Sequence, residues 1–124
     1  MRKKEIKTAN APIPGGPYSQ GIKKGGFIFI SGQVPIDPNT GKMVSGDITL
    51  KTEVVFKNIK AILEEEGLSL DDIVSLRIYL KYAEDFHAVN EVCKRLFTPP
   101  YPARTTIVAK ELPLNADIEI EVIA

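Results

Sequence analysis

The strongest constraint on the fold is an amphipathic pattern that runs from residue 48 to residue 63. Its members are apolar apart from one threonine, and they are Ile48, Thr52, Val55, Phe56, Ile59, Ile62 and Leu63. Spacings of three and four residues place these side chains on one face of an α-helix. Asp47 is suited to cap the N-terminus, and Gly67 stands where glycine commonly ends a helix. The pattern predicts a helix that starts at Ile48 and buries one face against another layer.

A second helix is predicted from Ala83 to Phe97. Its apolar face would consist of Phe86, Val89, Cys93, Leu96 and Phe97. Prolines at positions 99, 100 and 102 follow directly, and proline cannot continue a helix because it lacks the backbone N–H and clashes with the preceding turn.

Several segments have the composition of β-strands. Residues 27–34 are apolar and β-prone, which predicts a buried strand, and residues 37–41 form a turn signal after which residues 42–44 return as a hairpin partner. Further strands are predicted at residues 73–80, 105–109 and 118–123, the last with clear alternation. Residues 5–8 carry a weak strand signal, and the Pro- and Gly-rich residues 11–21 read as an ordered loop.

Without the weak N-terminal segment, the predicted order is β-β-α-β-α-β-β. Such strand–helix–strand units favour an α/β (α+β) fold with both helices on one face of a sheet. Residues 1–124 are expected to form one domain, since this length is close to the commonest domain size. The second face of the sheet still needs cover, which copies of the same chain could supply.

Composition excludes several classes of function. Sixteen Lys and Arg residues balance sixteen Asp and Glu residues, so no electrostatic footprint for nucleic acid or an anionic membrane is expected. One cysteine and one histidine cannot supply the four ligands of a structural zinc site. No apolar run approaches the length of a membrane span and no secretory leader is visible. A cytoplasmic protein without metal is the expectation.

Arg104 and Glu119 are candidate functional residues. Arg104 follows the stiff segment Pro99-Pro-Tyr-Pro-Ala103 at the head of a predicted strand, and a guanidinium binds a carboxylate through two parallel hydrogen bonds. It could equally be a surface arginine. Glu119 alternates with Ile118 and Ile120, but Glu121 has the same spacing, so the pattern alone does not choose between the two carboxylates.

Other polar residues each allow two readings. Tyr18 lies in the Pro/Gly loop, where it could bind a ligand or pack the loop, and Ser31-Gly32 ends an apolar strand, where the serine could bind a ligand or the local backbone. Asn90 falls on the buried side of the second helix and needs a hydrogen-bond partner in the backbone or a ligand. Cys93 reads as packing, and His87 as exposed or packed.

Six short motifs occur in order along nearly the whole chain. They are Ala11-Pro-Ile-Pro-Gly-Gly-Pro-Tyr-Ser-Gln-Gly21, Ile30-Ser-Gly-Gln-Val-Pro35, Asn58-Ile-Lys-Ala-Ile-Leu63, Asp85-Phe-His-Ala-Val-Asn90, Pro102-Ala-Arg-Thr-Thr106 and Ile118-Glu-Ile-Glu121. Together these motifs resemble the RidA/YjgF family of reactive-intermediate deaminases. The resemblance implies a chorismate-mutase-like fold. It also implies a homotrimer whose sheets form a central barrel, with active sites between subunits.

The implied activity is hydrolysis of 2-imino acids, such as 2-iminobutanoate and 2-iminopropanoate, to 2-keto acids and ammonia, without a cofactor. By motif, Arg104 would bind the substrate carboxylate and Glu119 would activate water. Tyr18, Ser31, Gly32 and Asn90 would line the pocket, and the backbone of Thr105 and Thr106 would meet the imine nitrogen. Many family members carry cysteine where this chain has Thr106, so its substrate range could differ.

Three other functions remain open at this point. Some relatives are named ribonucleases or translation inhibitors, although neutral charge and a single histidine argue against RNA binding. A non-enzymatic ligand-binding or chaperone-like trimer would have much the same sequence. Chorismate mutase shares the implied fold, but a fold does not determine a function.

Overall fold

A computed structural model describes residues 2–124. Its main sheet has six strands in the order β1-β2-β3-β8-β6-β7, and only the β6–β7 pair is parallel. The strands are β1 (Lys4–Ile6), β2 (Gly21–Lys24), β3 (Phe27–Gln33), β6 (Ser75–Leu80), β7 (Ala103–Val108) and β8 (Ile118–Ile123). The helices are α1 (Ile48–Glu64) and α2 (Phe86–Leu96). A separate hairpin pairs β4 (Ile36–Asp37) with β5 (Lys42–Met43), and 3₁₀ turns form at Leu70–Asp72, Ala83–Asp85 and Pro113–Asn115.

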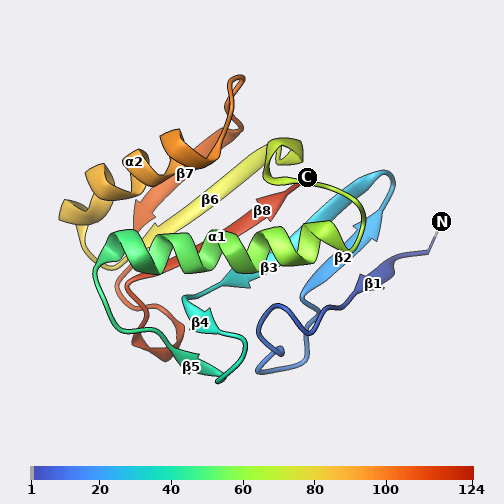
Figure 1. The fold of residues 1–124 in the computed structure, drawn as a ribbon, viewed down its shortest axis with the longest axis horizontal. Helices are drawn as coiled ribbons and strands as arrows, with labels where there is room; N and C mark the ends of the chain where they lie inside the picture. Colours follow the sequence, from blue (N-terminus) through green and yellow to red (C-terminus); the bar gives the residue numbers. More distant parts are fainter. Residues whose placement is uncertain (1) are drawn as a thin grey trace.

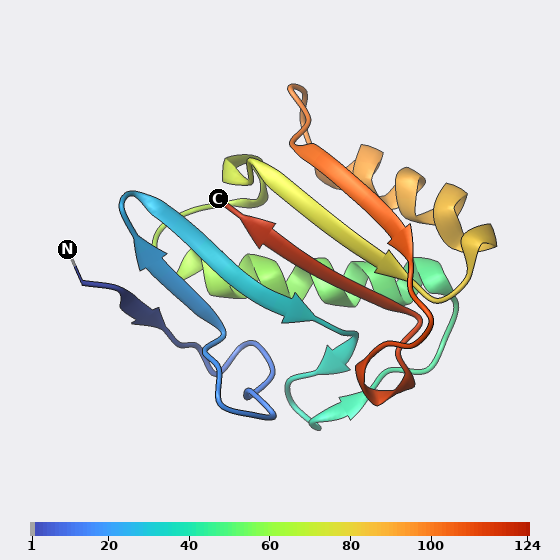
Figure 2. The ribbon, with the colours of Figure 1, turned by 180° about the vertical axis from the view of Figure 1, so that it is seen from behind.

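Both helices cover the same face of the sheet and leave the other face open (Figures 1 and 2). β3 and β6 run in the same direction on either side of β8, and α1 connects them. α2 connects the neighbouring parallel strands β6 and β7. This two-layer α+β architecture confirms the predicted fold class and the position of the helices. β7 is left as one edge of the sheet.

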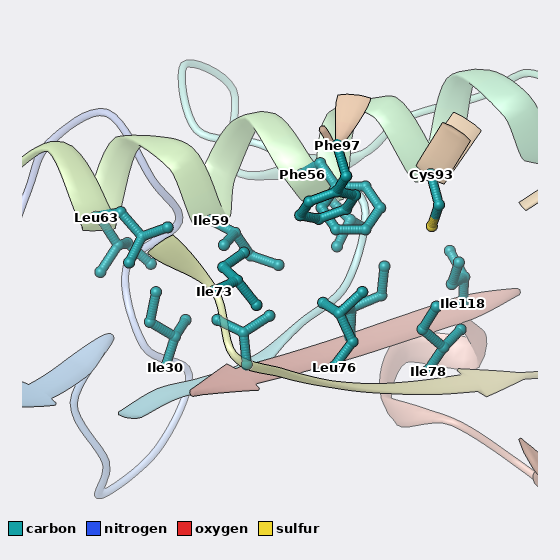
Figure 3. Close-up of a cluster of buried hydrophobic side chains, with 14 of the residues drawn as sticks. Ile30, Phe56, Ile59, Leu63, Ile73, Leu76, Ile78, Cys93, Phe97 and Ile118 are labelled. Carbon is teal, nitrogen blue, oxygen red and sulfur yellow. The ribbon is translucent and has the colours of Figure 1, made fainter. Parts of the chain in front are cut away.

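The core lies between the helices and the sheet (Figure 3). Val55, Ile59 and Ile62 on α1 are fully buried, as the apolar spacing predicts. Thr52 also belongs to this face, where its hydroxyl donates to the Ile48 carbonyl at 2.7 Å. Where the helices meet, the rings of Phe56 and Phe97 pack edge to face with centroids 5.4 Å apart. The Asp47 cap is confirmed, because its Oδ1 accepts the Leu50 N–H at 2.9 Å.

Three sequence predictions about strands need correction. β2 lies partly within the predicted loop and partly beyond it, and it was missed because Gly21-Ile-Lys-Lys24 has little β-prone character. The strand predicted as buried at residues 27–34 is buried on one face only, since Phe27 and Phe29 are exposed. The predicted hairpin at residues 42–44 forms with β4, outside the main sheet. The order β-β-α-β-α-β-β therefore describes the main sheet, apart from β1, with β2 and β3 as its first two strands.

One correction concerns the second helix. A 3₁₀ turn at Ala83–Asp85 precedes α2, so the α-helix starts at Phe86. Val89, Cys93 and Phe97 are buried as predicted, whereas Phe86 is 45% exposed. Phe86 lies in the first turn, beyond the part of the helix that packs on the core, and its ring has another partner described below.

The open face of the sheet presents large side chains without cover in a single chain. Phe29 on β3 and Ile107 on β7 are exposed on this face, and Arg77 and Tyr79 of β6 share it. An uncovered apolar sheet face of this kind usually marks an interface. That copies of the chain cover it remains a prediction.

Candidate active site

Arg104 stands on edge strand β7 and points to the helix layer. It pairs in register with Leu76, whose side chain is buried under the helices. Its guanidinium lies over the ring of Phe86, 5.4 Å from the centroid, which is within cation–π distance. No carboxylate of residues 2–124 forms an ion pair with Arg104. An arginine with a positioned guanidinium and no internal anion is suited to bind an external carboxylate.

A cavity of about 360 Å³ adjoins Arg104 between α2 and the sheet. Asn90 and Cys93 line it together with Arg104, so the structure brings two of the predicted site residues to one place. Cys93 points from α2 towards the sheet (Figure 3). Burial raises the pKa of the Cys93 thiol, and the Arg104 charge and hydrogen bond oppose that shift. The thiol therefore stays neutral and serves as an apolar wall with a weak polar contact.

Glu119 lies on β8 and points to the open face of the sheet, the face opposite the buried Ile118 and Ile120. Its carboxylate forms no hydrogen bond or ion pair with residues 2–124. Partial burial raises the pKa of Glu119, and the nearby charge of Glu121 adds to the increase. A carboxylate with a raised pKa and free oxygens is suited to accept and return a proton.

Gly32 makes room for this carboxylate. A Cβ atom on Gly32 would lie 2.7 Å from Glu119 Oε2 and 2.9 Å from Cδ, too close for any side chain. The register of β3 and β8 shifts between Ile30 and Gln33, so an extra residue on β3 faces β8 at this point. Gly32 thus contributes to the candidate site because its lack of a side chain leaves room for the Glu119 carboxylate.

Glu121 differs from Glu119 in its partners. The Tyr79 hydroxyl donates to Glu121 Oε1, and Arg77 lies 3.9 Å from the same oxygen. These contacts tie the Glu121 carboxylate to β6, whereas the Glu119 carboxylate has no hydrogen bond or ion pair in residues 2–124. Of the two carboxylates between which strand alternation did not choose, Glu119 is therefore the one whose oxygens have no partner in residues 2–124.

Tyr18 and Ser31 lie near Glu119, in a hollow of about 770 Å³ that all three line with Gly32. The Ser31 hydroxyl donates to the Ser19 carbonyl at 2.6 Å, so it holds the loop in place. The Tyr18 hydroxyl accepts the Gly15 N–H at 3.1 Å, and the ring is exposed. Tyr18 still has its own O–H to donate, while Ser31, whose O–H is already donated, can only accept through its lone pairs.

Thr105 and Thr106 differ in the direction of their backbone groups. The Ala103 and Ala109 N–H groups donate to β6 carbonyls, and by alternation the Thr105 backbone also faces β6. The backbone of Thr106 then faces the free edge of the sheet. Its hydroxyl is buried without a partner in residues 2–124. Of the two predicted backbone donors, Thr106 is the one with an N–H available at the edge.

Arg104 and Glu119 do not meet within one chain. They extend from opposite faces of the sheet and line different cavities. Arg104 and Asn90 make one half of the predicted site, and Glu119, Tyr18, Ser31 and Gly32 make the other half. A site that uses both halves requires a second chain.

Two further residues, one beside Arg104 and one in the hollow near Glu119, were not identified as functional from the sequence. Phe86 supports the Arg104 guanidinium, and its spacing of seven residues from Cys93 is a signal that could have placed both beside Arg104. Leu114 lines the hollow near Glu119 with a positive φ of 57° and 68% exposure. A left-handed leucine has no sequence signal, because this conformation is rare outside Gly, Asn and Asp.

Within residues 2–124, no group of three His, Cys, Asp or Glu side chains gathers in a way that could hold a metal ion. Neither helix in the described part of the chain has the length and hydropathy that a bilayer span requires.

Several known proteins match this chain over nearly its whole length. A RutC family protein of Pyrococcus abyssi is 52% identical over 100% of this chain and 98% of its own. A 2-iminobutanoate/2-iminopropanoate deaminase of Dermatophagoides farinae is 41% identical over 96% and 93%. The crystal structure of RidA from Psychrobacter sp. PAMC 21119 aligns over 97% of both chains with a TM-score of 0.93 and 41% identity. A family model described as Endoribonuclease L-PSP matches residues 8–124, and the chain therefore belongs to this family, also known as YjgF/RidA.

Proposed function

We propose that this protein hydrolyses small 2-imino acids to 2-keto acids and ammonia at sites shared between subunits of a homotrimer. The observation that carries the proposal is the division of the site. Arg104 has no internal anion and Glu119 has no internal donor, yet they extend from opposite faces of the sheet. The name of the Dermatophagoides farinae relative, 2-iminobutanoate/2-iminopropanoate deaminase, supports the choice of substrate.

The chemistry needs an anchor, a base and water. Arg104 of one subunit holds the substrate carboxylate through paired hydrogen bonds, which orients the imine carbon. Glu119 of the neighbouring subunit accepts a proton from water as the oxygen attacks that carbon. With the imine protonated on nitrogen, this attack gives a neutral carbinolamine. Glu119 then returns its proton to the amino nitrogen, the C–N bond breaks to release ammonia, and the hydroxyl proton of the carbinolamine passes through Glu119 to solvent as the carbonyl of the keto acid forms. One water is consumed and no redox change occurs.

The environment of each residue suits its role. Phe86 supports the guanidinium from below, so less orientational freedom is lost when a carboxylate binds. The pKa of Glu119 is raised by burial and by Glu121, which makes Glu119 a stronger base near neutral pH than an ordinary carboxylate. The Thr106 backbone at the open edge provides an N–H and a carbonyl for the imine group.

Complementation between two inactive variants tests the proposal. Arg104→Ala should lose roughly a hundredfold or more of activity because the carboxylate loses its anchor. Glu119→Ala should lose about a hundredfold to ten-thousandfold because the general base is gone. Both are co-expressed with different tags, and mixed oligomers are isolated by two affinity steps. Activity is the rate at which imines, made by an amino-acid oxidase, escape trapping by semicarbazide.

Shared sites give a definite result in this experiment. If each site of a trimer takes Arg104 and Glu119 from two neighbouring subunits, every mixed trimer regains both groups at one of its sites, so about a third of the sites in the isolated mixed oligomers are restored. Oligomers of the double variant Arg104→Ala/Glu119→Ala, isolated in the same way, serve as the inactive control. Mixed oligomers no more active than the single variants would contradict a shared site, and a wild type inert on every imine would refute the deaminase activity.

The alternative suggested by the name of the family model is RNA cleavage. Net charge is zero, and the single histidine, His87, is exposed beside Glu91 at 3.9 Å. Neither feature favours a polyanion. RNA binding at low salt that competes with a 2-keto acid for the Arg104 site would support this second function.

A further inference from the structure

The cavity beside Arg104 is larger than a small imino acid requires. It has a volume of about 360 Å³, whereas a cavity of roughly 150 Å³ is enough to hold a benzene molecule. A substrate with only a methyl side chain, bound through its carboxylate, would leave most of this space unfilled.

The wall of the cavity is mainly apolar. Leu76 comes from β6, Cys93 comes from α2, Phe97 follows directly after α2, and Tyr101 and Pro102 come from the segment that leads into β7. Polar side chains of α2 also line it, namely His87, Asn90, Glu91 and Lys94. Lys94 pairs with Glu91 at 3.5 Å, so Arg104 is the cation of this lining without a carboxylate partner in residues 2–124. A pocket with a broad apolar wall and such a cation suits an amphipathic anion.

The anchor and the wall are in direct contact. Arg104 and Cys93 line the same cavity, and the Arg104 charge is close enough to lower the pKa of the Cys93 thiol against the effect of burial, so a carboxylate on the guanidinium brings the rest of its ligand close to the apolar wall. Cys93 is one of the smaller side chains that could stand here, and its short side chain leaves the space beside the guanidinium open.

We propose that this cavity is a side-chain pocket that selects 2-imino acids with large apolar side chains, with Cys93 and Tyr101 as specificity-determining residues. This rests on the proposed function, because the carboxylate anchor is the same Arg104. Each methylene that moves from water into the pocket should raise kcat/KM about fourfold. The imine of leucine has three more carbons than that of alanine and should therefore react more than about tenfold better.

The test uses imines that an L-amino-acid oxidase makes from alanine, 2-aminobutyrate, norvaline, leucine and phenylalanine. For each imine, the protein competes with semicarbazide, and the trapping rate without protein normalises the result. Wild type is compared with Cys93→Leu, which fills the pocket, and with Tyr101→Ala, which removes a wall. Tyr101 is 56% exposed, so its replacement leaves the core intact even if Cys93→Leu fails to fold.

Tyr82→Ala is the matched control, since Tyr82 is a similarly exposed tyrosine that does not line the cavity. The expected result is a leucine-to-alanine ratio of kcat/KM above about tenfold in wild type and Tyr82→Ala, and several-fold lower in Tyr101→Ala and in folded Cys93→Leu. Equal efficiency across the series, or a ratio unchanged in Tyr101→Ala, would overturn the pocket but leave the deaminase proposal intact. Failure of wild type on every imine would instead defeat the deaminase proposal itself.

Discussion

Glu119 and Glu121 occupy equivalent positions on one strand but differ in chemistry. The Tyr79 hydroxyl and Arg77 occupy Glu121, whereas Glu119 has free oxygens and a raised pKa. The difference arises from neighbours on β6 and from the empty space at Gly32, and both come from other parts of the chain. A residue's function here depends on which strands lie next to it.

The first prediction concerns pH. Glu119 acts as a base only when it is deprotonated, so activity should rise with pH through its raised pKa, and the midpoint should lie above the 4.5 of an ordinary glutamate. Glu121→Gln removes a charge that contributes to the increase, so its midpoint should move to lower pH. The measurement is kcat/KM against pH for wild type, Glu121→Gln and Glu119→Gln. The Glu119→Gln variant should lose the rise of activity with pH. A midpoint unchanged in Glu121→Gln would contradict the assigned cause.

The second prediction concerns Gly32. Gly32→Ala should destabilise the protein by about 1–3 kcal/mol, because the new methyl group overlaps the Glu119 carboxylate. The same change in a Glu119→Ala background should cost far less, since the atoms that clash are gone. Urea unfolding of the four proteins in this double-mutant cycle measures the coupling. Equal costs in both backgrounds would show that Gly32 is needed for another reason.

Elements of secondary structure position the two halves of the site. α2 carries Phe86, Asn90 and Cys93 on the side that faces Arg104, and the irregularity between Ile30 and Gln33 allows β3 to pass the Glu119 carboxylate. α1 contributes no side chain to either cavity. Its role is to bury the face that β6 and β8 turn towards the helices.

The third prediction tests the start of α1. Asp47→Ala should lower stability by about 1 kcal/mol, because the Leu50 N–H loses its acceptor. Asp47→Asn is the matched control and should retain most of the stability, since asparagine caps nearly as well. Thermal unfolding should show a decrease in Tm of a few degrees for the alanine variant only. Equal Tm values for the alanine and asparagine variants would contradict the capping role.

At the scale of the whole molecule, the open sheet face exposes apolar side chains that nothing in residues 2–124 of a single chain covers. Phe29 and Ile107 lie there with 45% and 48% of their surface exposed, and β7 leaves one edge of the sheet unpaired. A trimer that closes the sheets over one another would bury these groups and bring Arg104 near a neighbour's Glu119. Assembly and activity should therefore be lost together.

The fourth prediction tests this coupling. Phe29→Lys places a charge on the open face and should dissociate the protein into monomers, because an unpaired charge is costly at a buried interface. Activity should fall with assembly, although Arg104 and Glu119 are unchanged. Leu50→Lys is the matched control, with 44% exposure on α1. Light scattering after size exclusion gives the mass, and a fully active Phe29→Lys monomer would contradict the shared site.

Prediction from the sequence succeeded where the signal is local. The apolar period of α1 and its Asp47 cap depend on residues a few positions apart, and the alternation of β8 is equally local. Prediction failed where the outcome depends on residues that are distant in sequence. β2 has weak β-propensity and forms because β1 and β3 pair with it on both sides. Phe86 has the spacing of a core residue, but in the structure its ring contacts the Arg104 guanidinium.

The sequence alone determined the two helices, most of the strands and the family resemblance, because periodicity, capping and motifs are written along the chain. The motif resemblance also proposed Arg104 and Glu119, whereas strand alternation by itself left Glu119 and Glu121 equivalent. Only the tertiary structure decided that Glu119 is the free carboxylate and that Arg104 stands on the opposite face. The reason is physical, since pairing, burial and sheet face depend on strands that are distant in sequence and adjacent in space.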